Sequence, residues 1–349
     1  MTKTSMVAVH GSYFAENYGD TLLVRMMCDK IARMIGKDNV YLAVEGDARE
    51  QKDIGYPVVP KSSRREITHL VFGGGGYFGE RTKMPIDNVI WSVRNYVRHL
   101  SWVRNFPNAR KAVIGAGFGP ITNRILRSRV RSFMYGCELV LVRDIESLAF
   151  MEAYSIRHPK VDTCVDLALT LPCVDEARTG IALHVDNLSQ GEIDLVFRSL
   201  RASSMQSEGI EVIFDNKPSD TGRNRDKYIK AAAQHGFPSC VFIPYKDVDT
   251  LLGRVANYAL VITSKLHVGI TTIAQGGRAI SIPGHQKTIR LYNQLGLSHY
   301  CISRPELTVE LLCRAIENLS LYTPDRNVIV AGSKRIDGAL DDFLFSSKP

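Results

Sequence analysis

The chain has 349 residues, of which 45% are hydrophobic and 23% are charged, and its formal net charge is +8 at pH 7. This composition excludes a disordered chain, and the length favours two domains over one, because single cores rarely grow beyond about 250–300 residues. No segment approaches the roughly 20 apolar residues that a transmembrane helix requires.

The first residues and the cysteines predict a cytoplasmic protein. Residues 1–5 lead directly into a strand-like segment and do not form a signal peptide. The seven cysteines lie far apart without a CxxC pair, which is typical of reduced thiols and not of disulfides or a zinc site. The positive charge favours an anionic substrate or membrane surface. We expect no nucleic-acid partner, because basic patches interleaved with aromatic residues are not evident.

Strand-like and helical patterns alternate along the chain, as in doubly wound α/β proteins. The first half has expected strands at 6–11, 40–44, 69–73, 111–115 and 139–143. Pro172 and the charged run 175–178 then predict a linker. The second series of expected strands is 180–185, 211–214, 240–243, 260–263 and 279–282.

These patterns predict two doubly wound, Rossmann-like domains, 1–175 and 176–325, that face each other across a cleft. Residues 326–349 form the tail of the chain. The tail ends in an apolar pattern that includes Leu340, Phe343 and Leu344. We expect it to be helical and to pack on a domain surface.

Three glycine-rich turns follow expected strands of the first domain, at 11–20, 73–76 and 115–120. Glycine lets the backbone approach a ligand or adopt positive φ. Tight turns in a Rossmann-like sheet would explain them equally well. None matches GxGxxG with its acidic partner or a P-loop, so a dinucleotide site is not indicated. The candidate residues for lining the cleft are Asn17, Gly19, Asp20, Gly74, Gly75 and Gly117.

Arg143 ends an apolar strand and Asp144 starts a helical pattern. The guanidinium is therefore expected at the carboxyl edge of the sheet, near the glycine-rich turns. A satisfied ion pair between Arg143 and Asp144 is the alternative. Asp162 and Asp166 follow shortly after, and helix capping is the simpler explanation for them.

The strongest signal lies in residues 258–287. Ser264, Lys265 and His267 sit on the turn between an expected buried strand and helix, and Lys287 follows the next strand. Ligands of open α/β sheets bind at this edge, where helix N-termini offer backbone N–H donors to anions. Two ammonium groups and an imidazole thus predict a site for a small, highly charged substrate. A purely orienting role for His267 remains the alternative.

The motifs resemble, in order, those of the polysaccharide pyruvyl transferases. They are Gly19-Asp20, the run 73–76, Gly115-x-Gly117-x-Gly119-Pro120, Arg143-Asp144-x-x-Ser147, Asp166-x-Ala168 and Ser264-Lys265-Leu266-His267. The resemblance covers about residues 7–287 and implies a GT-B-like fold with two Rossmann-like domains. It also implies transfer of pyruvate from phosphoenolpyruvate onto a sugar of a surface polysaccharide or its lipid-linked precursor, as a ketal.

The resemblance implies roles for particular residues. Arg143, Ser264, Lys265 and Lys287 would bind the donor, and His267 would be the acid–base catalyst. Fixed cations can neutralise phosphoenolpyruvate, so no metal and no cofactor are expected. The family usually has arginine where Lys265 stands, and an ammonium lacks the planar fork that grips a carboxylate with two hydrogen bonds.

The glycan acceptor that the resemblance implies also suggests a partner for the protein and a location in the cell. Lipid-linked glycans lie at the inner face of the cell membrane, and the segment 123–135 contains arginines that would suit peripheral contact with anionic lipid, Arg124, Arg127, Arg129 and Arg131. A solvated helix face is the alternative. Two other functions stay open, a GT-B glycosyltransferase that uses a nucleotide sugar and a non-catalytic binding relative. The acceptor sugar, the ketal positions and the oligomeric state are not specified by these motifs.

Overall fold

The computed structural model of the chain describes residues 5–14, 17–79, 85–185, 188–205, 209–215, 221–237 and 240–346, without the side chains of 85–87 and 221–224. The chain forms two compact units. The first unit comprises residues 1–16, 20–167 and 330–349, and the second comprises 17–19 and 168–329. The chain thus passes between the units more often than a single linker near residue 175 would require.

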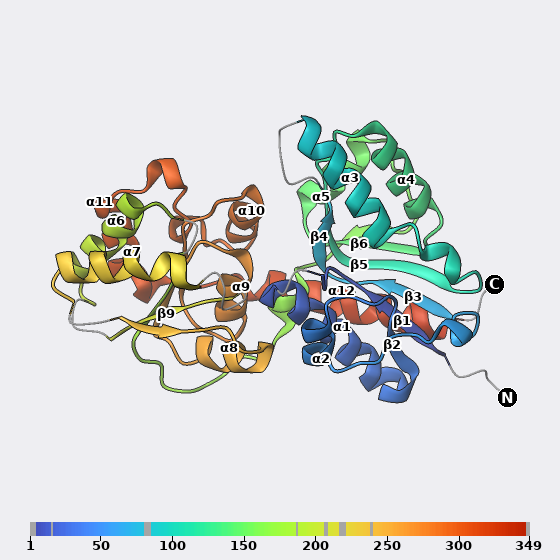
Figure 1. Cartoon of the computed structure of the whole chain (residues 1–349), viewed down its shortest axis with the longest axis horizontal. Helices are drawn as coiled ribbons and strands as arrows, with labels where there is room; N and C mark the ends of the chain where they lie inside the picture. The colour runs from blue at the N-terminus through green and yellow to red at the C-terminus, as the bar shows by residue number, and fades with distance from the viewer. Residues whose placement is uncertain are drawn as a thin grey trace. The chain divides into compact units, whose positions relative to one another are not determined.

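The first unit is built on a parallel sheet with the order β2-β1-β3-β5-β6-β7, and β4 also pairs with β5 (Figure 1). Its strands are β1 (Val7–His10), β2 (Val40–Leu42), β3 (His69–Phe72), β4 (Gly75–Phe78), β5 (Arg110–Phe118), β6 (Leu139–Val142) and β7 (Val161–Thr163). The strand order reverses between β1 and β3, as it does at the ligand-binding switch point of doubly wound folds.

Helices connect these strands. They are α1 (Tyr18–Ile35), α2 (Ala48–Ile54), α3 (Pro85–His99), α4 (Arg124–Tyr135) and α5 (Ile145–Ala153). Asp47, Asn123 and Asp144 cap α2, α4 and α5 by accepting backbone N–H bonds. From Val330 onward, α12 (Arg326–Phe345) belongs to this unit, and its Leu340, Phe343 and Leu344 are buried as expected for a helical tail that packs on a domain.

The second unit has a five-stranded parallel sheet with the order β10-β9-β8-β11-β12. Its strands are β8 (Ile181–His184), β9 (Ile210–Ile213), β10 (Val241–Ile243), β11 (Leu260–Thr263) and β12 (Ala279–Ser281). Its helices are α6 (Gln190–Ala202), α7 (Thr221–Gln234), α8 (Val248–Val255), α9 (Leu266–Ala274), α10 (Gln286–Gln294) and α11 (Val309–Glu317). In the register of β8 and β11, Thr263 lies beside His184, so both strands end at the same place.

The predicted α/β class with two Rossmann-like units is confirmed, and each expected strand is present to within a few residues. The glycine-rich turn predicted at 73–76 is shorter than expected, because Gly75 already begins β4 with φ of 123°. The sequence pattern also missed β7, since this strand has just three residues and none of them is buried. The cleft between the units stays a prediction.

Candidate active site

The turn between β11 and α9 is fixed to the neighbouring strand β8. The backbone N–H of Ser264 donates to the carbonyl oxygen of His184 at 2.8 Å, and the Ser264 hydroxyl donates to the same oxygen at 3.3 Å. The backbone N–H of Lys265 donates to Thr263 Oγ1 at 3.1 Å. Ser264 is therefore buried and already bonded, so its main contribution is to hold the turn in place.

A buried carboxylate, Asp215, lies under this turn. Its Oδ1 accepts a hydrogen bond from the Lys265 ammonium and lies 3.3 Å from His184 Nε2. The other ring nitrogen of His184 lies 3.0 Å from Thr263 Oγ1. Burial alone would raise the pKa of Asp215, but the adjacent His184 and Lys265 hold it below its ordinary value. Asp215 therefore stays ionised and fixes the two basic side chains.

His267 lies in the first turn of α9, where every residue is buried. Gly19 packs directly against its ring, and any side chain at that position would collide with the imidazole. The segment that carries Gly19 is held by two bonds. Asn17 Oδ1 accepts from the Gly19 N–H at 3.0 Å, and the Tyr18 N–H donates to the carbonyl oxygen of Asp215 at 3.2 Å. Of the predicted cleft-lining residues, Gly19 thus contacts this turn, and Asn17 holds the backbone of Gly19.

The helices α9 and α10 begin at this edge of the sheet. Their N-cap residues are Lys265 and His285, and neither side chain accepts a capping hydrogen bond from its helix. By contrast, Asp, Asn, Ser or Thr side chains cap α2, α4, α5, α6, α8 and α11. Uncapped N–H groups and the positive end of a helix dipole suit an anion. Lys287 lies half-buried in the first turn of α10, the helix that follows the neighbouring strand β12.

Arg143 lies in the first unit, in a different setting. Its guanidinium contacts Asp166 Oδ2 at 3.2 Å and Asp144 Oδ2 at 3.4 Å, and all three side chains are buried. Gly117 makes room for the guanidinium, since a Cβ there would come within 2.7 Å of Arg143 Nη2. Asp144 also caps α5 through the Ser147 N–H at 2.7 Å. The alternative of a satisfied ion pair therefore describes the contacts of Arg143, and Asp166 is one of its two partners.

The remaining glycine-rich turn brings Asp20 and Gly75 together in the first unit. A Cβ built on Gly75 would lie 3.7 Å from Asp20 Oδ1. A Cβ built on Gly74 would instead lie 3.2 Å from Cδ1 of Leu23. Asp20 and Gly75 thus lie close together. Gly74 faces the buried Leu23, so the interior packing of the unit explains the glycine at that position.

The other histidines at strand ends differ in accessibility. His10 is fully buried among aromatic rings of the first unit, with its Nε2 2.9 Å from His99 Nδ1. Burial lowers the pKa of both, that of His99 to about 3. His285 is exposed.

Sequence reasoning missed Asp215, although a polar residue two positions after strand β9 was a signal for it.

No helix in the described part of the chain is long and apolar enough to cross a membrane. Among those same residues, no three His, Cys, Asp or Glu side chains are grouped as metal ligands would be.

Two parallel α/β sheets of this kind define a fold class that solved glycosyltransferases and epimerases share. A glycosyltransferase from Rickettsia africae is 11% identical over 99% of this chain and 100% of its own, with a TM-score of 0.57. A UDP-GlcNAc 2-epimerase from Neisseria meningitidis, bound to UDP-GlcNAc, is 8% identical over 98% and 100%, with a TM-score of 0.57. An Anabaena protein in complex with UDP and glucose is 11% identical over 98% and 95%, with a TM-score of 0.52. Identities this low show the fold alone.

Within this class, the chain belongs to the polysaccharide pyruvyl transferase family, whose model matches residues 17–286. The matched range includes Gly19, Arg143 and the Ser264–His267 turn, and it ends beside Lys287. A search of the curated proteins found no match. The family and the fold together make the protein a transferase of polysaccharide biosynthesis.

Proposed function

We propose that the protein transfers pyruvate from phosphoenolpyruvate to a sugar of a surface polysaccharide, or of its lipid-linked precursor, and forms a pyruvate ketal. Membership of the pyruvyl transferase family supports the reaction class. The observation that carries the proposal is the turn after β11. There the buried His267, the Lys265 ammonium and the uncapped start of α9 lie together, beside the first turn of α10, which carries Lys287.

The donor carries a carboxylate and a phosphate, so its site must supply positive charge in a place that excludes water. We assign this task to Lys287 and to the backbone N–H groups that begin α9 and α10. Lys265 shares its charge with Asp215, so it supplies a weaker contact than an uncommitted ammonium would. Arg143 faces two buried carboxylates, so we assign it to holding its corner of the first unit, in place of the donor contact expected from the sequence.

The reaction needs protons at defined atoms. The methylene carbon of phosphoenolpyruvate gains a proton, and a sugar hydroxyl attacks the central carbon and loses its own. Phosphate then leaves with the electrons of the broken C–O bond, and a second hydroxyl attacks the same carbon and loses its proton to a base, which closes the ketal. His267 is the proposed acid and base for these transfers, since an imidazole exchanges protons near neutral pH. Fixed cations neutralise the donor in this scheme, so it requires no metal and no cofactor.

The test is an incubation of the full chain with phosphoenolpyruvate and lipid-linked or polymeric glycans from the source organism. Phosphate release and the mass of the glycan are measured together, with His267→Asn as the inactive control. Acceptor-dependent phosphate release with pyruvate bound to the glycan is the expected result. Tight calorimetric binding of UDP- or GDP-sugars without binding of phosphoenolpyruvate would instead identify a nucleotide-sugar glycosyltransferase. Donor binding without turnover on any acceptor would identify a non-catalytic relative.

We further propose that α3 and α4 of the first unit contact anionic lipid at the inner face of the cell membrane, where lipid-linked acceptors lie. The support is an exposed apolar row on α3, in which Val89, Ile90, Val93 and Val97 are each more than half exposed. Ile125 at the start of α4, a helix that contacts α3, is 74% exposed. Exposed apolar side chains beside arginines are typical of interfacial helices.

Three of the four arginines of α4 suit this role. Arg124, Arg129 and Arg131 are exposed. Arg127 instead donates to the carbonyl oxygen of Ile121 and lies over the Tyr154 ring at 4.1 Å, so it is committed to the fold. Flotation with phosphatidylserine vesicles tests the proposal. Ile90→Asn with Val93→Asn should release the protein, whereas Val330→Asn, at an equally exposed helix position elsewhere, should not. Equal flotation of all variants would contradict it.

A further inference from the structure

The second unit contains a pocket of about 510 Å³ that is separate from the candidate active site. Ala259 directly precedes β11 and Arg278 directly precedes β12, and both line the pocket. The pocket therefore lies at the amino edge of the parallel sheet. Ser264, Lys265 and Lys287 follow the carboxyl ends of the same strands, at the opposite edge.

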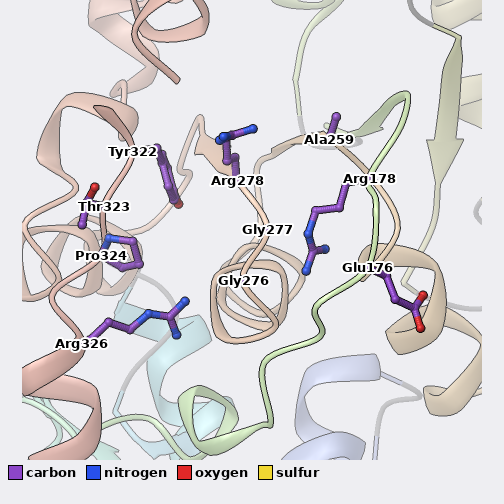
Figure 2. Close-up of a pocket in the computed structure, with 10 residues that line it drawn as sticks. All are labelled: Glu176, Arg178, Ala259, Gly276, Gly277, Arg278, Tyr322, Thr323, Pro324 and Arg326. Atoms are coloured by element: carbon purple, nitrogen blue, oxygen red, sulfur yellow. The ribbon is translucent and has the colours of Figure 1, made fainter. Parts of the chain in front are cut away.

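Three arginines line this pocket against one carboxylate. Arg178, Arg278 and Arg326 contribute guanidinium groups, and Glu176 is the acidic residue. Figure 2 shows Arg178 and Arg326 approaching the turn at Gly276 and Gly277 from opposite sides, with Arg278 and Tyr322 above it. A pocket of this size admits a small molecule much larger than one phosphate ion.

The partners of these arginines leave the positive charge largely uncompensated. Arg178 donates to three carbonyl oxygens, those of Ala256, of Val174 at 2.9 Å and of Gln275 at 2.6 Å. These oxygens are neutral acceptors. Within the described ranges, the side chains of Arg278 and Arg326 form no ion pair and are exposed. Burial lowers the pKa of Arg178, and repulsion by the charge of Arg278 also lowers it, while Cys173 and Glu176 act in the opposite direction.

The glycine pair explains how Arg178 comes to lie in the pocket wall. Gly276 has φ of 91°, and a Cβ on Gly277 would lie 3.3 Å from Arg178 Nη1 and 2.8 Å from Thr272. The turn therefore lets the guanidinium approach the C-terminal end of α9, where it donates to the carbonyl oxygen of Gln275. Tyr322 is fixed on the other side, because its hydroxyl donates to the carbonyl oxygen of Ala279 at 3.1 Å. The pocket is thus held in shape by bonds that leave the exposed arginines available.

We propose that this pocket binds a small diphosphate-bearing molecule. A guanidinium offers phosphate oxygens a planar pair of N–H donors, so Arg278 and Arg326 around one cavity match two phosphates, and the charge of Arg178 in the wall adds to the attraction. The main part of the second unit runs from residue 168 to residue 329, and Arg178 and Arg326 lie near its two ends. The ligand would therefore contact both ends of this segment. Binding would therefore stabilise the folded chain, by an amount that rises with the logarithm of the ligand concentration once the pocket is saturated.

The probe is inorganic pyrophosphate, added to the full chain at low salt and followed by calorimetry and thermal unfolding. The parent protein should bind it and unfold at a higher temperature. Arg278→Gln and Arg326→Gln should each weaken binding by about tenfold, since each removes one charge-assisted contact. Both side chains are exposed, so the variants should keep the fold, which circular dichroism checks.

Matched variants distinguish binding in this pocket from a general attraction of pyrophosphate to a basic protein surface. Arg201→Gln removes an exposed positive charge of α6 outside the pocket and should leave binding unchanged. Glu176→Gln removes the only carboxylate among the lining residues and should tighten binding. No binding by the parent at millimolar pyrophosphate would overturn the proposal. It would also be overturned if Lys287→Ala abolished binding while the pocket variants bound normally, because pyrophosphate would then occupy the candidate active site.

Discussion

The corner around Arg143 in the first unit and the corner around Asp215 in the second use similar residue types but differ in charge. In the first corner one guanidinium faces two carboxylates, so the three side chains have a net charge of −1. In the second corner one carboxylate faces the Lys265 ammonium and the His184 ring. That group is neutral when His184 is neutral and positive when His184 is protonated.

This difference shows why a cation at a strand end is not by itself an anion site. A phosphorylated donor would be repelled by the excess carboxylate beside Arg143. Beside Asp215 it would meet no excess negative charge, and Lys287 and two uncapped helix ends add positive potential there. The partners of a basic residue decide its role, and those partners come from elements distant in the sequence.

The largest expected effect is at His267. His267→Asn should reduce turnover by roughly 10² to 10⁴, the usual contribution of general acid–base catalysis, while donor affinity stays near that of the parent. Turnover at saturating phosphoenolpyruvate and calorimetric donor affinity are measured side by side. If affinity collapses and turnover at saturation persists, His267 is a donor ligand, and the acid–base role passes to another group.

Removing Arg143 should chiefly affect stability. Arg143→Ala leaves Asp144 and Asp166 buried without their cation, and breaking a buried pair in this way costs about 3 kcal/mol or more in the free energy of unfolding. Urea denaturation measures this loss. Arg143→Lys, which keeps the charge, should recover part of it. A stable Arg143→Ala protein with weakened donor binding would restore the donor role that the sequence indicated.

The class of fold was predictable because the buried strands of both parallel sheets appear as continuous apolar runs, such as 260–263 and 139–143. The turn with Ser264, Lys265 and His267 was predictable for the same reason, since it directly follows one of these runs. Strand β4 was not, because it starts in a glycine run that also favours turns. The pairings of Lys265 with Asp215 and of Arg143 with Asp166 were not predictable either, because a sequence does not specify which strand ends meet.

Loss of the Lys287 ammonium should weaken donor binding. Lys287→Ala removes one charge-assisted contact, which corresponds to about ten- to a hundredfold in affinity. Calorimetry with phosphoenolpyruvate measures the change, and Arg201→Ala, at an exposed position of α6, serves as the matched loss of charge. Unchanged affinity in Lys287→Ala would remove the main cation from the proposed site.

The Asp215 corner should also contribute to acid sensitivity. The pKa of Asp215 is lowered in the folded chain, so its stabilising effect is fully present above about pH 4 and is lost as the pH falls through the folded pKa. Asp215→Asn should therefore be less stable than the parent at pH 6, and the difference should narrow toward pH 2. The free energy of unfolding at several pH values measures this. A constant difference would mean that Asp215 is not ionised in the folded chain.

The smallest expected effect is that of Lys265→Arg, which compares an ammonium with a guanidinium at the same corner. A guanidinium can hold Asp215 with one N–H group and offer another to the donor, so we expect the KM for phosphoenolpyruvate to fall by roughly threefold with turnover unchanged. Lys265→Met is the matched control, because it keeps the length and removes the charge; it should leave Asp215 with His184 alone and raise the KM. Complete loss of activity in Lys265→Arg would show that the turn is built around the smaller ammonium. The pairing with Asp215, and not donor contact, would then be the reason for a lysine at this position.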